Sequence, residues 1–153
     1  MDSAKLHDWL QVIGVFGVIA GMVFLAFELR QNHDMMKAQT RQALAQSAID
    51  LLWREGENGE LANIIRRGDA GEELSADELF RYRYTNIAFF VYWENVHYQY
   101  RAGLINDSEF EPQKLVWRLR TAKPGIHEVW CSNRNTISPA VVAEVESMMA
   151  DKC

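Results

Sequence analysis

The chain has 153 residues, a formal net charge of −5 at pH 7, and acidic and basic side chains that are mixed along its length. This charge balance argues against a nucleic-acid-binding protein, which would normally carry a basic face. The length leaves room for one compact domain besides a membrane segment.

Residues 10–29 are the most apolar part of the chain, with no charged side chain from Val12 to Phe27. About 20 apolar residues in a helix match the roughly 30 Å hydrocarbon core of a bilayer. A cleaved signal peptide is disfavoured, because Lys5 is outweighed by two aspartates and no small-x-small cleavage site follows. Apolar side chains on all faces also distinguish this helix from an amphipathic soluble one. The sequence therefore predicts a transmembrane helix over residues 9–30.

The charges on either side of this helix predict its orientation. Arg30, Lys37 and Arg41 follow the helix, whereas Lys5 and the amino terminus precede it. By the positive-inside rule, residues 31–153 are expected to form a cytoplasmic helical domain.

Three glycines of the membrane helix, Gly14, Gly17 and Gly21, fall on nearly one face and include a GxxxG pattern. Glycine lets two helices approach closely in lipid. The pattern is consistent with helix–helix contact, in a homo-oligomer or with another membrane protein, although glycine is also common in membrane helices without such a role.

The rest of the chain predicts all-α structure, a small helical bundle, because no segment alternates strictly between apolar and polar residues. The first helix is expected to continue beyond the membrane with an apolar stripe through Leu44, Leu51 and Leu52. Ser75 and Glu78 form a capping-box pattern. They begin the longest helix, whose many aromatic residues predict a central, fully packed position. Further helices are expected over residues 60–67, over 126–130, and in two segments that begin at predicted caps. Asp107 or Ser108 is predicted to cap the helix that ends before residue 123, and Ser138 is predicted to cap the last helix.

The two cysteines, Cys131 and Cys153, lack CxxC spacing and are too few for a disulfide framework. They are expected as reduced thiols in a reducing compartment. A periplasmic domain would allow a bridge between them.

Catalytic and metal-binding motifs are absent from the sequence, so no catalytic residue, cofactor or metal site is predicted. Glu94 and His97 have the Glu-x-x-His spacing of di-iron bundle proteins, but no second pair exists. No Cys or His partner at ligand spacing is predicted for three further histidines, His7, His33 and His127.

Polar side chains interrupt the aromatic helix, and buried polar groups require hydrogen-bond partners. They predict either a polar network, with the Tyr98 hydroxyl as a natural partner, or a small-molecule pocket with aromatic walls. The candidate residues are Asn86, Trp93, Glu94, Asn95, His97 and Tyr98. Four arginines could instead face anionic lipid headgroups or solvent: Arg81, Arg83, Arg118 and Arg120.

The segments 24–32 (FLAFELRQN) and 93–100 (WENVHYQY), the latter followed by Gly103-Leu104, resemble a group of short bacterial proteins with one N-terminal membrane helix and a helical domain. The resemblance implies this layout and a bacterial inner membrane, and it implies no substrate or mechanism. The leading functional hypothesis is a non-enzymatic interaction protein whose partners are the lipid bilayer and a second copy or another membrane protein, with no nucleic acid. The alternatives are a small-molecule sensor with an aromatic pocket and an oligomeric channel or transport accessory subunit.

Overall fold

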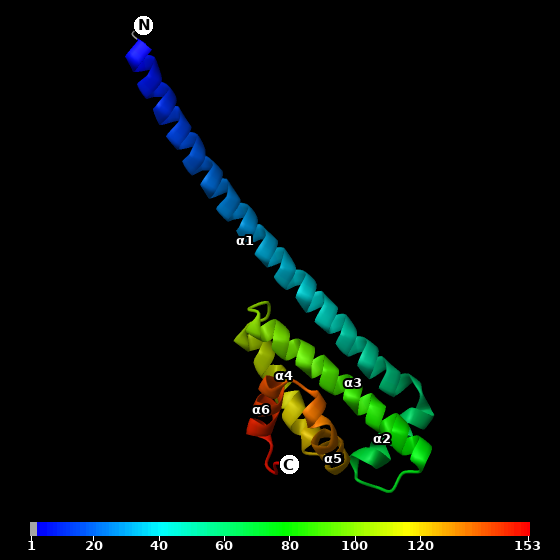
Figure 1. The fold of residues 1–153 in the computed structure, drawn as a ribbon. Helices are drawn as coiled ribbons and strands as arrows, with labels where there is room; N and C mark the ends of the chain where they lie inside the picture. Colours follow the sequence, from blue (N-terminus) through cyan, green and yellow to red (C-terminus); the bar gives the residue numbers. More distant parts are fainter. Residues whose placement is uncertain (1–2) are drawn as a thin grey trace. The chain divides into compact units, whose positions relative to one another are not determined.

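The structure is a computed structural model that describes residues 3–153, except the side chains of residues 3–6 and 8, so the flanking Lys5 lies outside the described side chains. The described residues form helices and no strand, which confirms the all-α prediction. In chain order the helices are α1 (Ser3–Glu57), α2 (Gly59–Asp69), α3 (Ala76–Arg101), α4 (Asp107–Thr121), α5 (Pro124–Asn133), the 3-10 helix η1 (Arg134–Thr136) and α6 (Pro139–Met148) (Figure 1). The chain divides into two compact units, Met1–Gln39 and Thr40–Cys153.

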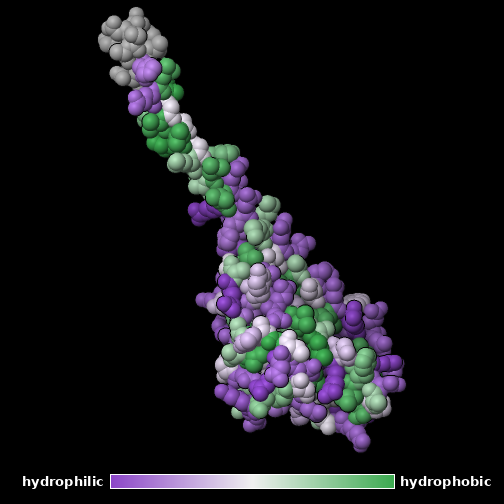
Figure 2. Space-filling view, in the orientation of Figure 1, coloured by the Kyte–Doolittle hydropathy of each residue, from purple (hydrophilic) through white to green (hydrophobic). Residues whose placement is uncertain are grey.

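The first unit contains the apolar part of α1. Its large apolar side chains between Trp9 and Leu29 are 46% to 69% exposed, and Figure 2 shows hydrophobic residues gathered around these turns. The helix is long and apolar enough to cross a membrane, and none of its most apolar window is buried. The structure thus contains a long apolar N-terminal helix whose hydrophobic surface has no cover within the described residues.

The second unit is a helical bundle organised around α3, which contacts α2, α4, α5 and α6. Its interior consists largely of aromatic rings. Trp93 of α3 stacks on Trp117 of α4 at a centroid distance of 5.5 Å, and Phe90 meets Trp130 of α5 edge-on at 5.1 Å. All four side chains are at most 1% exposed. The central position predicted for the aromatic helix is therefore confirmed.

One face of α3 remains uncovered, contrary to the expectation of packing on all sides. Phe80 and Tyr84 are each 59% exposed and Tyr98 is 67% exposed. Phe80 and Tyr84 lie against each other with centroids 4.4 Å apart. The aromatic residues therefore divide between core and surface, because the neighbouring helices approach α3 from a limited range of directions.

The last turns of α1, from residue 40 to residue 57, belong to the bundle unit. Leu44 is buried and Leu51 is half-buried, as the predicted stripe requires. Leu52 was placed in the same stripe, and this prediction is wrong because its side chain is 58% exposed. Each residue rotates a helix by about 100°, so Leu52 points away from the face that Leu51 buries.

Side-chain caps define the starts of the bundle helices. The Ser75–Glu78 capping box is present, as predicted. At α4 the cap is Asn106, not the predicted Asp107 or Ser108. Asn106 Oδ1 accepts the Glu109 backbone N–H at 3.2 Å, and Glu109 Oε2 accepts the Asn106 N–H at 3.0 Å. Asparagine supplies the same short acceptor as serine, so Asn-x-x-Glu works as a capping box.

The crossing of α2 and α5 requires two glycines. A Cβ atom at Gly125 would overlap the backbone carbonyl oxygen of Gly68 and lie 2.9 Å from the Tyr82 hydroxyl. A Cβ atom at Gly68 would lie 2.6 Å from the Tyr82 ring. The absence of side chains lets the two helices approach closely over Tyr82, whose hydroxyl donates to Asp69 at 3.1 Å.

Gly125→Ala is expected to lower the free energy of unfolding by about 1–3 kcal/mol, the usual cost of overpacking a tight contact. Urea unfolding of the full chain in mild detergent, followed by circular dichroism, measures this cost. Gly56→Ala is the matched control, because a Cβ atom there meets nothing within 4 Å. A Gly125→Ala variant as stable as Gly56→Ala would show that α2 and α5 do not cross so closely.

Candidate functional site

The glycine face of the first unit is open in the described structure. A Cβ atom built at Gly14, Gly17 or Gly21 would meet nothing within 4 Å. The three residues lie on a continuous α-helix, so their spacing keeps them near one side of α1. This surface is small and flat enough for the close approach of a second helix.

Glu94 of α3 holds the start of α6. Its carboxylate Oε1 accepts the backbone N–H of Ser138, the N-cap residue of α6, at 2.8 Å. The Ser138 side chain makes no capping hydrogen bond itself. A carboxylate at a helix N-terminus satisfies an unpaired donor and interacts favourably with the helix dipole. Glu94 therefore joins two elements that are 44 residues apart in sequence.

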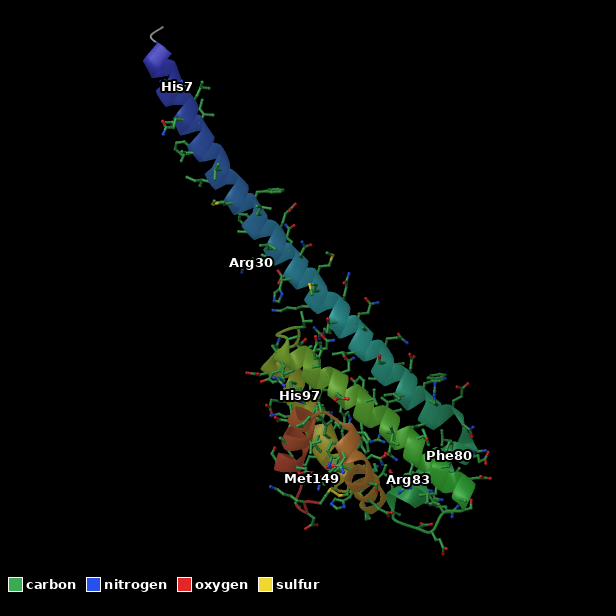
Figure 3. The ribbon with its side chains drawn as sticks, in the orientation of Figure 1. His7, Arg30, Phe80, Arg83, His97 and Met149 are labelled. Carbon is green, nitrogen blue, oxygen red and sulfur yellow. A yellow bond between two sulfur atoms is a disulfide. The ribbon has the colours of Figure 1, made fainter. Side chains whose placement is uncertain are left out.

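His97, one turn after Glu94, lies in a different environment. Its side chain is 7% exposed, and its ring centroid is 6.0 Å from that of Phe110. Burial lowers the pKa of His97, Arg101 acts in the same direction, and Glu144 partly opposes them. The Glu-x-x-His pair thus contains one carboxylate used as a helix cap and one imidazole kept near the core. Figure 3 shows His97 toward one end of α3, with Phe80 and Arg83 toward the other.

The stability of the bundle is expected to fall as the pH drops through about 6.5, because of His97. The folded state disfavours the charged imidazole, so its pKa there lies below the unfolded value. Between the two values the unfolded state binds more protons, and the unfolding free energy decreases with decreasing pH. His97→Gln should flatten this part of the profile in urea titrations, whereas His33→Gln, at an exposed position of α1, should not. If the unfolding free energies of wild type and His97→Gln changed equally with pH near 6.5, the pH dependence would not come from His97.

Asn86 is buried in the bundle at 1% exposure, and its polar partners differ from those expected. Its Nδ2 donates to the Tyr82 carbonyl at 3.0 Å, and its Oδ1 accepts from Arg120 at 3.5 Å. The prediction of Tyr98 as a network partner is wrong, since Tyr98 is 67% exposed. Asn95 is also exposed and accepts a hydrogen bond from Gln99.

The six residues predicted as a network or pocket do not form one site. Glu94, His97 and Tyr98 line a surface depression together with Arg101, Ala102 and Ser138. Trp93 lies in the aromatic core, whereas Asn86 and Asn95 do not line this depression. Successive residues of α3 point in different directions around the helix, so proximity in sequence did not produce convergence in space.

An ion pair that the sequence analysis missed connects the last turns of α1 to the bundle. Arg120 Nη2 lies 3.2 Å from Glu55 Oε1, and the two side chains are 14% and 18% exposed. The guanidinium carbon lies 3.8 Å from the ring centroid of Phe89. The suggestion that Arg120 faces lipid headgroups or solvent is therefore wrong. The available signal was its position one turn after the buried Trp117, on the core side of α4.

The C-terminus is covalently attached to α5. Cys131 and Cys153 form a disulfide with a Cα–Cα distance of 5.5 Å, so the prediction of two reduced thiols is wrong for this structure. His127 lies one turn before Cys131, and its Nδ1 is 3.9 Å from Cys131 Sγ. The statement that His127 lacks a cysteine partner at ligand spacing is also wrong. The His-x-x-x-Cys spacing was visible in the sequence, whereas the return of the C-terminus to α5 was not.

Several polar groups of the bundle therefore hold its elements together. Glu94 caps α6, Asn86 and Glu55 hold Arg120, and the disulfide fastens the C-terminal tail. The exposed large apolar side chains lie on α1 and on the surface of the bundle. Comparisons of this chain with protein families, with curated proteins and with solved structures found no match.

Proposed function

We propose that this chain is a membrane-anchored interaction protein, with residues 9–30 crossing a bacterial inner membrane and the helical bundle acting as a contact module. The observation that carries the proposal is the contrast between the two units. The bundle buries its tryptophans almost completely, except Trp53, whereas the large apolar side chains of α1 between Trp9 and Leu29 are 46% to 69% exposed. Exposed apolar surface of this extent is stable in contact with lipid or another protein and unfavourable in water.

A second exposed apolar face, on the last turns of α1, supports a protein contact. Ile49, Leu52 and Trp53 are 54%, 58% and 68% exposed. Depressions lie on both sides of Trp53, one with Ile49 and Leu52 among its lining residues and the other with Asp50 and Leu61. A protruding tryptophan beside hollows is typical of the residues that dominate binding energy at protein interfaces.

The proposed orientation places the bundle in the cytoplasm, on the basis of the three basic residues that follow the apolar segment. Fusion of alkaline phosphatase, which is active only after export, to the C-terminus tests this orientation. An inactive fusion, together with an active fluorescent-protein fusion, would support a cytoplasmic bundle. An active phosphatase would place the bundle in the periplasm, where the disulfide would persist.

Site-specific photo-crosslinking in native membranes tests the interaction role. A photoreactive amino acid in place of Trp53 is expected to give a covalent adduct larger than the monomer. The matched control is the same amino acid at Asp77, an exposed position at the start of α3. The interaction role would be contradicted if the probe at position 53 gave only monomer and a second probe at position 17 also gave only monomer.

Self-association through the glycine face has its own test. Gly17→Ile places a branched side chain on the middle residue of the three-glycine face and should reduce adducts from a photoreactive residue at position 14. Val18→Ile, on an adjacent face of the same helix, is the control. Mass determination of the adduct separates a dimer from the ring that an oligomeric channel requires, and from a complex with a different protein. The sensor alternative has less support, because Trp93 belongs to the packed core and not to the surface depression.

A further inference from the structure

Three side chains with metal-binding groups meet where the C-terminal tail returns to α5. His127 and Cys131 are one helical turn apart, and Cys153 joins them from 22 residues further along the chain. One ligand atom from each residue can be chosen so that all three lie within 4.8 Å of one another. The cluster combines two sulfurs and one imidazole, a donor set that suits a thiophilic ion such as Zn²⁺.

His127 uses its ring nitrogen Nε2 in a hydrogen bond, which leaves Nδ1 available to bind a metal. Its Nε2 lies 3.0 Å from the backbone carbonyl of Asp151. A carbonyl oxygen can only accept, so Nε2 carries the proton and the neutral ring has its free lone pair on Nδ1. Nδ1 lies 3.9 Å from Cys131 Sγ. Nε2 is at the same distance from this sulfur. A tetrahedral zinc site places nitrogen and sulfur ligands about 3.5 Å apart, so metal binding requires the disulfide to open and the three side chains to rotate. Metal-bound histidines commonly donate their second N–H to a carbonyl in this way.

The cluster is accessible to solutes. His127 and Cys131 are half-buried, and Cys153 is exposed. In the reducing cytoplasm, where the bundle is proposed to lie, close cysteine pairs more often serve redox or metal chemistry than permanent cross-linking. Because Cys153 is exposed, thiol reductants can reach the disulfide. For the same reason, water can occupy the fourth coordination position of a bound metal.

We propose that His127, Cys131 and Cys153 form a redox-controlled site for a thiophilic divalent cation of the Zn²⁺ class. A dithiol reductant supplies two electrons and two protons to the disulfide, which becomes two thiols while the reductant becomes a disulfide. The cation then binds two thiolates and His127 Nδ1, and two protons are released to solvent. Oxidation of the two thiolates expels the cation and restores the disulfide, with a disulfide-class oxidant accepting the two electrons.

Either state attaches the C-terminal tail to α5. With the disulfide formed, the link is covalent, and the preceding residues Met148 and Met149 pack against the core. With the metal bound, coordination by Cys153 makes the same connection. In the reduced, metal-free state neither link joins residue 153 to α5, so the site would couple the metal and redox conditions of the cell to the conformation of residues 149–153.

Metal titration of the full chain in mild detergent tests the proposal. After reduction with a phosphine, Co²⁺ is used as a spectroscopic probe and Zn²⁺ as a competitor. The reduced protein is expected to bind one Co²⁺ per chain with thiolate-to-cobalt charge-transfer absorption, which Zn²⁺ abolishes. The oxidised protein is expected to show no such absorption.

Variants distinguish the site from adventitious thiol binding. Cys153→Ser should abolish the charge-transfer band of a one-to-one complex. His127→Ala, which keeps both cysteines and the disulfide, should weaken Zn²⁺ binding at least about tenfold, the smallest effect usual for a residue that supports a metal site. His33→Ala, on the exposed surface of α1, should bind as wild type does. Reduced wild type that takes up no metal, or His127→Ala with wild-type affinity, would overturn the proposal. These measurements use purified protein. A negative metal titration would therefore overturn the metal site without bearing on the interaction role, which the crosslinking experiment tests separately.

Discussion

Trp93→Ala is expected to destabilise the bundle by about 3–5 kcal/mol, the largest effect of any single substitution considered for this chain. The side chain is 1% exposed and contacts three aromatic rings, those of Phe90, Trp117 and Trp130. Truncation removes these contacts and leaves a cavity that rigid aromatic neighbours fill poorly. Domains of this size are stable by about 5–15 kcal/mol, so the variant should unfold at a much lower urea concentration.

Trp53→Ala is the matched control for this substitution. It removes the same side chain from a position that is 68% exposed, and it should change stability by no more than about 0.5 kcal/mol. Near-ultraviolet circular dichroism and urea unfolding of the full chain in detergent measure both effects. The pair also separates folding from function, because Trp53→Ala should keep the fold and remove the proposed contact residue. Similar losses of stability for the two variants would show that the aromatic core is not organised around Trp93.

The second large effect is expected for Glu55→Ala, at about 3 kcal/mol. Removing one partner of a buried ion pair usually costs about 3–5 kcal/mol, because the other charge is left without compensation. The lower end of this range applies because the two side chains retain 14% and 18% exposure. Arg120 would keep only the Phe89 ring and a 3.5 Å contact to Asn86, and its Nε atom has no hydrogen-bond partner among the described residues. Urea unfolding of the full chain measures the loss.

A double variant shows whether the cost comes from the stranded charge. Glu55→Leu combined with Arg120→Met removes both charges with side chains of similar size, and should recover much of the stability lost in Glu55→Ala. The control is Glu60→Ala, which breaks an ion pair with Arg81 whose side chains are 70% and 50% exposed. That pair is expected to contribute at most about 1 kcal/mol. If Glu55→Ala costs no more than Glu60→Ala, the Arg120 pair is not a buried interaction.

Local features of the sequence predicted local features of the structure well. The capping box at Ser75 and the helix-ending Gly103, with its positive φ of 73°, begin and end α3 close to where they were expected. The apolar run before residue 30 predicted an uninterrupted helix with an exposed apolar surface, and this helix is present. These features depend on hydrogen bonds and side chains a few residues apart, so a short stretch of sequence contains all the information they need.

Predictions that required a distant partner were less successful. Asn86 was recognised as a polar residue among aromatics, but its contact with Arg120 spans 34 residues. The sequence places Arg120 at lipid headgroups or in solvent, whereas a charged side chain can be largely buried when it is paired. Its partner Glu55 is 65 residues away in sequence. Pairing of this kind depends on whether the last turn of α1 comes within reach of α4, which helical periodicity alone does not specify.

By itself, the sequence determined the helical class, the main helices and the apolar segment that suits a membrane, because each follows from spacing and composition within one element. Only the tertiary structure decided which side of α3 is core, that Glu94 and His97 serve separate purposes, and that Cys153 returns to Cys131 beside His127. The physical reason is that a helical pattern defines faces but not which neighbour covers them. Burial, ion pairing and the meeting of His127 with the two cysteines are properties of the assembled helices, and they arise when distant segments come within a few ångströms of one another.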